Sequence, residues 1–175
     1  MDPLWRDLAA GLVAAALLVF ALLLGATLHL HRQRRRAEER AAAAAGRRIV
    51  AEVPAGSDLV LFCEDAERFY FGAASVAKAD VRAVRLVVGG AAVSEEAVPG
   101  YQPRALPASV TARGEAVPGR EHWDVVLETV SDALVVPCGA LGERVSQEIA
   151  CRIFERAKAA VAGTPAAQAR GPGLE

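Results

Sequence analysis

The sequence predicts an α+β fold in which a small antiparallel sheet domain, closed by a C-terminal amphipathic helix, follows an N-terminal transmembrane helix. Three observations predict it. Residues 8–30 form an apolar run, strand-length runs bounded by turn residues recur between 48 and 137, and apolar residues recur at helical spacing over 143–161. Because the chain has 175 residues, there is room for one compact domain of ordinary size beside the helix.

The N-terminal segment, residues 1–31, contains the predicted membrane span. Its run LAAGLVAAALLVFALLLGATLHL, residues 8–30, has no Asp, Glu, Lys or Arg. A helix of this length would be about 34 Å long, enough to cross a hydrocarbon core of about 30 Å. A cleaved secretory signal is the alternative, but it would need a basic leader and a shorter apolar core, and the leader holds only Arg6 as a basic residue. The pattern therefore favours a retained anchor.

Basic residues cluster on one side of this run and predict its orientation. Only Arg6 precedes the run, whereas five arginines follow it: Arg32, Arg34, Arg35, Arg36 and Arg40. The positive-inside rule then puts the N-terminus outside, and the following domain in the cytoplasm, of a protein in the inner or plasma membrane. The same arginines could bind anionic lipid headgroups, although a topology signal already explains them. The lipid bilayer is accordingly an expected partner.

Small residues within the predicted helix have the spacing of helix–helix contacts. The pairs are Gly11 with Ala15 and Ala21 with Gly25. Small residues four apart let two helices approach closely. An Ala-rich sequence also produces such pairs by chance, so both interpretations stay open.

Residues 32–46 predict a basic helical linker. The stretch AEERAAAAAG favours helix and ends at Gly46, so we expect it to continue the N-terminal helix. The domain is expected over 47–163, and residues 164–175 are expected to be a disordered tail.

The domain begins with short runs typical of antiparallel strands, separated by turn residues. They are 48–53, 58–63, 68–72, 80–88, 122–130 and 133–137. The runs 58–63 and 68–72 are expected to form a first hairpin, and 122–130 and 133–137 a second. Residues 91–121 are interrupted by Pro and Gly and are expected to form a long loop with one edge strand. In the 122–130 strand, alternation predicts that Trp123 is buried and that Asp124 and Glu128 face away from the core, while Pro137 is expected to end the last strand.

One amphipathic helix is predicted to close the domain over 143–161. Its apolar stripe is Val145, Ile149, Ile153, Ala157 and Val161, with Phe154 beside it. Five to seven short strands followed by such a helix favour a bent sheet whose open corner the helix covers. The expected architecture is an α+β sandwich or partly open barrel.

These residues resemble the bacterial pleckstrin-homology-like (PH-like) domains found behind one or two transmembrane helices. The resemblance lies in LVLFCEDAERFYFG (59–72), ADVRAVRLVVG (79–89) and WDVVLETVSDALVVPC (123–138) followed by the closing helix, and it spans 48–162. It implies a binding or scaffolding module without catalytic residues. Some members are similar to lipid binders, but the first hairpin here lacks the Lys and Arg that would contact phosphoinositides.

The residue inventory predicts no catalytic residue, metal site or cofactor. No P-loop, G-x-G-x-x-G after a strand, G-x-S-x-G or H-E-x-x-H is present. The spacing of Cys63, Cys138 and Cys151 fits neither a disulfide framework nor a zinc site. We therefore expect them to be small core residues of a protein in a reducing compartment. The only histidine of the domain, His122, is expected to be a surface or rim residue. The acidic residues around 64–67 are expected to form a solvated turn.

The near-neutral charge of the domain and its lack of catalytic or metal-binding motifs lead to two functional hypotheses. Residues 47–175 carry fourteen Lys and Arg against seventeen Asp and Glu, so no nucleic-acid surface is expected, and no small-molecule substrate is indicated. The first hypothesis is a membrane-anchored, non-catalytic interaction or scaffold module that recruits other membrane or cytoplasmic proteins. The alternative is a small constitutive subunit or assembly factor of a larger membrane protein complex.

Overall fold

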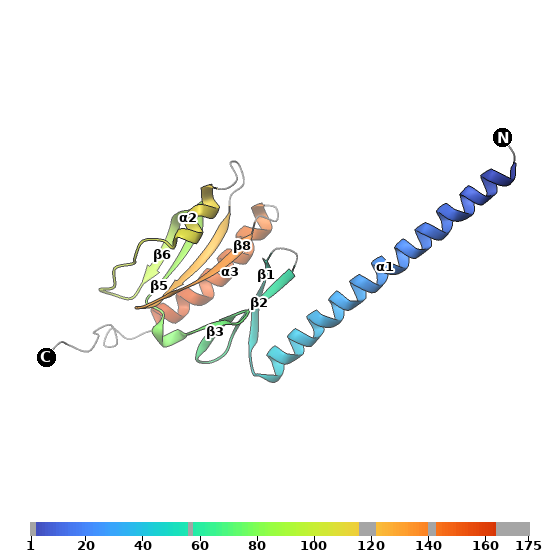
Figure 1. The fold of residues 1–175 in the computed structure, drawn as a ribbon. Helices are drawn as coiled ribbons and strands as arrows, with labels where there is room; N and C mark the ends of the chain where they lie inside the picture. The colour runs from blue at the N-terminus through green and yellow to red at the C-terminus, as the bar shows by residue number, and fades with distance from the viewer. Residues whose placement is uncertain (1–2, 56–57, 116–121, 140–142, 164–175) are drawn as a thin grey trace. The chain divides into compact units, whose positions relative to one another are not determined.

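The computed structural model describes residues 3–55, 58–115, 122–139 and 143–163, without the side chains of 3–16 and of a few further positions. The chain divides into two compact units, Met1–Ala45 and Gly46–Glu175, and each is described by itself. The predicted tail, 164–175, lies outside the described residues. The elements are α1 (Pro3–Ala44), β1 (Arg48–Ala55), β2 (Asp58–Glu64), β3 (Arg68–Phe71), β4 (Ala74–Ala77), the 3-10 helix η1 (Lys78–Asp80), β5 (Ala83–Val88), β6 (Ala91–Ala97), α2 (Ala108–Glu115), β7 (Trp123–Glu128), β8 (Ala133–Gly139) and α3 (Glu143–Ala162) (Figure 1).

The first unit is one helix, α1, which ends where the sequence predicts an end. It continues through the Ala-rich linker to Ala44, and Gly46 follows with a φ of +68°. Glycine adopts this left-handed conformation at little cost, so Gly46 suits the position that terminates a helix. The prediction that the N-terminal helix continues through the linker is therefore confirmed.

The prediction that α1 spans a membrane is wrong. Over the residues that the structure describes, no helix is both long enough and apolar enough to cross a bilayer. The predicted single-pass topology, and with it the localisation in the inner membrane with the N-terminus outside, is corrected accordingly.

The second unit contains two four-stranded antiparallel sheets. Sheet A has the order β1-β2-β3-β4, and sheet B has the order β6-β5-β7-β8 (Figure 1). The predicted hairpin of β2 and β3 and the hairpin of β7 and β8 are both confirmed. Within the described strands neither sheet closes into a barrel, so the α+β sandwich is the form observed.

The core lies between the two sheets and α3. Sheet A contributes Phe62 and Phe69, whose rings stack 5.8 Å apart, and sheet B contributes alternate residues of β5 and β7 such as Leu86 and Leu127. From α3, Ile153 is fully buried against them. The helix is amphipathic for this reason, and the prediction that it closes the sheets is confirmed. Val145, at its start, is the exception and is 54% exposed.

The topology of sheet B includes one crossover between strands that are not neighbours. β5 pairs with β6 on one side and with β7 on the other, so the chain must cross a face of the sheet to pass from β6 to β7. Residues 98–115 make part of this crossing, and α2 lies within them. The predicted edge strand in 91–121 is β6, whereas α2 was not predicted, because its apolar residues are too few to set a helical period.

Two further predictions about the strands are wrong. All six residues of β7 are buried, including Asp124 and Glu128, because both faces of sheet B are covered. β8 continues through Pro137 to Gly139, which is possible because β8 is an edge strand and needs no N–H from Pro137 on its open side.

Candidate functional site

The outer face of sheet B is the face turned away from α3, and it carries three of the four charged side chains that are buried among the described residues. It is formed by Arg85 and Val87 of β5 and by Asp124, Val126 and Glu128 of β7. Val87, Val126 and Val110 of α2 form a small buried cluster at its centre, and Leu106 packs against them. Residues 104–113 therefore lie on this face as a cover, with a charged group at each end of the apolar cluster.

Glu128 is the centre of the first charged group. Its side chain is 1% exposed, and it accepts at least four hydrogen bonds. Arg85 Nη2 donates at 2.9 Å to one carboxylate oxygen; the other accepts from Tyr101 Oη at 3.1 Å and from Arg104 N and Nε at 2.8 and 2.9 Å. Such charge-assisted bonds occupy the lone pairs that a general base would use. The arrangement is suited to fixing the covering segment.

Arg104 connects this group to the turn between β7 and β8. Its Nη2 donates to the carbonyl oxygens of Thr129 and Asp132, each at 3.0 Å. A pocket of about 240 Å³ lies beside Arg104 and is lined by Arg85, Glu128 and Asp132 among others. Burial, followed by the charge of Glu128, raises the pKa of Tyr101, so its hydroxyl remains a donor at neutral pH. The turn is therefore held by the same arginine that anchors the cover.

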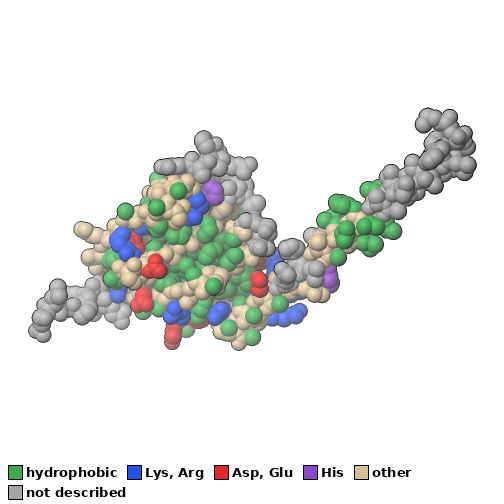
Figure 2. All heavy atoms as spheres, in the orientation of Figure 1, with side chains coloured by type: hydrophobic (Ala, Val, Ile, Leu, Met, Phe, Trp, Pro, Cys, Tyr) green, Lys and Arg blue, Asp and Glu red, His purple; other side chains and the backbone are tan. Residues whose placement is uncertain are grey.

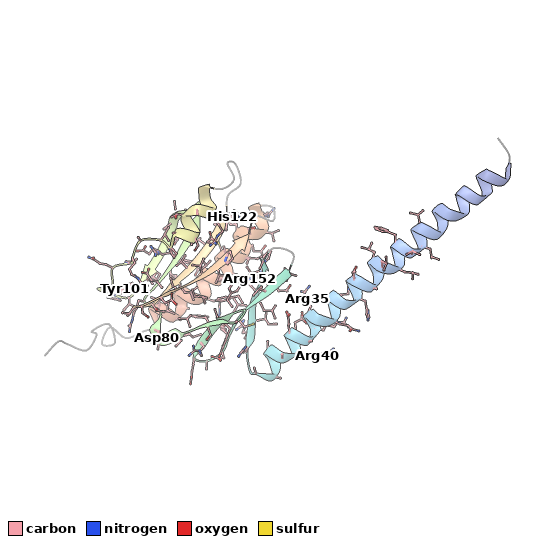
Figure 3. All side chains as sticks on the ribbon, in the orientation of Figure 1. Arg35, Arg40, Asp80, Tyr101, His122 and Arg152 are labelled. Carbon is pink, nitrogen blue, oxygen red and sulfur yellow. The ribbon has the colours of Figure 1, made fainter. Side chains whose placement is uncertain are left out.

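The second charged group lies at the start of β7. Asp124 is fully buried, and one of its carboxylate oxygens, Oδ1, accepts from Arg113 Nη2 of α2 at 3.1 Å. Burial raises the pKa of Asp124, and the Arg113 charge offsets part of that effect. Figure 3 shows Tyr101, which donates to Glu128, and His122, which precedes Asp124 by two residues, toward opposite ends of β7. The Glu128 group and the Asp124 group are therefore separate.

A third buried carboxylate connects sheet A to α3. Glu64 is 4% exposed; its Oε2 accepts from Lys78 Nζ at 3.0 Å, and its Oε1 accepts from Arg156. Burial opposes ionisation, but the hydrogen bonds and charges of Arg156 and Lys78 together outweigh it and lower the pKa of Glu64. The prediction of a solvated acidic turn is therefore wrong for Glu64. The prediction of a polar turn describes Asp65 better, because its carboxylate oxygen Oδ1 accepts hydrogen bonds from the backbone N–H groups of Glu67 and Arg68.

A groove lies on the other side of the β7–β8 turn. It has a volume of about 270 Å³, and its wall includes every residue of β4. The opposite wall is formed by Thr129, Asp132 and the first residues of β8. Arg68 lines it as well and donates from Nη2 to Ser75 Oγ at 2.9 Å, while Asp80 is exposed at its rim. The groove combines small apolar side chains with acidic groups.

The sequence-predicted site residues all belong to α1, and none of them is a member of the three charged groups. Arg35 pairs with Glu39 at 3.2 Å, and Arg32, Arg36 and Arg40 are exposed (Figure 3). The side chains of Arg34, Gly11 and Ala15 lie outside the described residues. Ala21 is exposed, and a Cβ at Gly25 would meet no atom within 4 Å, so there is space for a close approach at this pair.

The three carboxylate groups were not predicted, because the sequence pattern places their acids in solvent. One signal was available: Asp124 and Glu128 lie on the same face of one strand, and Arg85 lies on a neighbouring strand-length run. Opposite charges within two strands of one sheet indicate an internal ion pair. Among the described residues no three His, Cys, Asp or Glu side chains are grouped as metal ligands, and Cys63, Cys138 and Cys151 are free thiols.

Comparison with known proteins identifies no relative. The sequence matches no protein-family model, and neither the curated proteins nor the solved structures include a significantly similar chain. The fold itself therefore defines the class: an α+β domain of two antiparallel sheets closed by a C-terminal helix, preceded by a long helix.

Proposed function

We propose that this protein is a non-catalytic interaction module of PH-like type that recruits or assembles partner proteins. The observation that carries the proposal is that the buried carboxylates of the domain are paired with basic side chains. Glu128, Glu64 and Asp124 are buried in pairs with cations, where they fix the sheets, the cover and α3. Both carboxylate oxygens of Glu128 and of Glu64 accept hydrogen bonds, whereas a catalytic acid or base keeps a reacting oxygen free toward its substrate.

The architecture gives the proposal its second support. Two antiparallel sheets closed by a C-terminal helix are what the resemblance to PH-like domains implies. Such a sandwich leaves edge strands at its margins, and here β4 and β6 are edge strands whose side chains are largely exposed. Open strand edges are surfaces on which protein partners can dock through backbone hydrogen bonds.

The alternative, a small constitutive subunit or assembly factor of a larger complex, is favoured by one observation on α1. Large apolar side chains are exposed on successive turns of the helix, with Leu17, Phe20 and Leu24 being 62%, 64% and 51% exposed (Figure 2). Large apolar side chains exposed together in one segment mark an interaction site. In this alternative the helix itself binds the partner.

Affinity purification of the tagged full-length chain, with and without residues 1–31, tests the proposal and separates it from the alternative. For an interaction module, we expect a stoichiometric protein partner to be retained when residues 1–31 are removed, with reciprocal capture when the partner is tagged. Loss of that partner on removal of 1–31 would favour the constitutive subunit. Failure of reciprocal capture with either chain would contradict the interaction function.

A further inference from the structure

β4 is the edge strand of sheet A that opens into the groove. It pairs with β3 alone, in the register Tyr70 with Ser75 and Arg68 with Ala77. A two-residue turn joins the two strands, and Gly72 in that turn has a φ of +58°. In such hairpins the pair that flanks the turn, here Phe71 and Ala74, exchanges backbone hydrogen bonds.

The alternation of antiparallel pairs then determines which backbone groups of β4 are open. Hydrogen-bonded and non-bonded pairs alternate, so Phe69 with Val76 is bonded, and Glu67 with Lys78 is the next bonded pair. The hydrogen bond of 2.7 Å from Lys78 N to Glu67 O agrees with this alternation. Ser75 and Ala77 therefore direct their backbone N–H and C=O groups away from β3, toward the groove.

The groove has the chemistry of a site for an extended chain. The small side chains of Ala74 and Ala77 line it and leave room for the side chains of an incoming strand. Its charged lining consists of two acidic residues, Asp80 and Asp132, and one basic residue, Arg68, whose Nη2 donates to Ser75. The excess of acidic groups favours a basic side chain on the occupant.

We infer that β4 binds an extended segment of a partner protein as an additional strand of sheet A, and that this segment carries a Lys or Arg flanked by small residues. This inference rests on the proposed interaction function and assigns it a surface. Backbone hydrogen bonds to Ser75 and Ala77 provide the affinity. The acidic residues Asp80 and Asp132 select the basic side chain, and the volume of the groove limits the size of its neighbours.

Proline at position 77 tests the role of the open edge with little change to the fold. The φ of Ala77 is −72°, which proline adopts without strain, and the N–H that proline lacks is one that points away from β3. Ala92→Pro is the matched control, because Ala92 pairs with Val87 next to the bonded turn pair of the β5–β6 hairpin and lies on the other exposed edge. Asp80→Lys, with Glu95→Lys on β6 as its control, tests the charge.

The probe is a displayed library of random twelve-residue peptides, selected on the full-length chain and followed by affinity measurements with the enriched peptides. We expect the enriched peptides to share a basic residue between small ones. Ala77→Pro and Asp80→Lys should each weaken binding about tenfold, and the two controls should leave it within about twofold. Thermal unfolding of each variant establishes that it is folded.

Three outcomes would overturn the inference: no enrichment, peptides that bind wild type and Ala77→Pro equally, or peptides that lose binding only in the β6 controls. None of these affects the reciprocal purification that tests the interaction function. A partner captured there by a chain whose β4 edge binds no peptide would preserve the proposed function and reject this surface. If Ala77→Pro does not fold, the comparison of Asp80→Lys with Glu95→Lys decides the matter alone.

Discussion

At the scale of single residues, the domain is organised by carboxylates that are buried with their cations. Glu128 is the most extensively bonded, since Arg85, Arg104 and Tyr101 all donate to it. Removing one partner from a buried ion pair leaves the other charge without compensation, which costs more than the pair itself contributes. The consequences of changing one residue are therefore larger here than on the surface.

Glu128→Gln is expected to lower the free energy of unfolding by about 3–5 kcal/mol. Glutamine keeps the size of the side chain but leaves the guanidinium of Arg85, which is 5% exposed, without its counter-charge. Glu95→Gln, on the exposed part of β6, is the control and should stay within about ±0.5 kcal/mol. Equal denaturant midpoints for the two variants would show that the Glu128 group does not hold the cover.

Glu64 should contribute stability that is lost in acid. Its pKa is lowered in the folded protein by Arg156 and Lys78 against the opposing effect of burial. The contribution is therefore complete above the pKa of the unfolded chain and is lost as pH falls through the folded pKa. Glu64→Gln should flatten the fall in unfolding free energy below about pH 4, whereas Glu67→Gln, an exposed neighbour, should retain the wild-type profile.

Asp124 should act with the opposite sign. Burial raises its pKa above that of the unfolded chain, so its contribution is complete below the unfolded pKa and is lost as pH rises through the folded pKa. Asp124→Asn removes the ionisable group and with it this loss of stability at higher pH. The unfolding free energy of the variant should therefore rise relative to that of wild type as pH increases from about 3 to 7. Denaturant titrations at each pH would measure the difference. A constant difference across that range would contradict a raised pKa.

At the scale of elements, α3 and the cover over sheet B determine how the two sheets are closed. α3 packs its buried stripe between the sheets, and the ion pair of Arg156 with Glu64 fixes the helix to sheet A. The cover is held by Arg104 at one end and Arg113 at the other, with Val110 between them. Each element thus combines an apolar contact with an ion pair that sets its position.

Ile153→Ala should lower the free energy of unfolding by about 2–5 kcal/mol through lost burial and the cavity that remains. Ile153 is fully buried in the main core. Arg152→Ala and Glu155→Ala, at exposed positions on either side, should change it by no more than about ±0.5 kcal/mol. Denaturant midpoints compare the three variants, and a silent Ile153→Ala would mean that the stripe is not core.

At the scale of the whole molecule, the chain consists of a long helix and a domain with its own core. The two compact units divide at Ala45 and Gly46, and the core residues of the sheets and α3 all belong to the second unit. A unit that contains its own core has the contacts that cooperative unfolding requires. The helix instead presents apolar side chains to its surroundings.

A chain that begins at Gly46 is expected to unfold cooperatively, at a midpoint close to that of the full-length chain. The expectation follows from the main core, whose members among the described residues all belong to the second unit. Thermal unfolding by circular dichroism, with a second probe such as tryptophan fluorescence, would measure it. Recovery of the shortened chain only as aggregate would favour the constitutive-subunit alternative, in which the domain depends on a partner's surface.

The sequence by itself determined the elements whose pattern is local. Alternation within 58–63 and 133–137, the stop at Gly46 and the helical period of 143–161 each depend on neighbouring residues, and each element is present. Only the tertiary structure decided the position of Asp124 and Glu128, because alternation places two faces on a strand but does not say that a later segment covers both. The crossing from β6 to β7 provides that cover, which is why acids that the pattern places in solvent are buried beside arginines from distant parts of the chain. The groove at β4 has the same origin, since it exists only where the edge of one sheet meets the turn of the other.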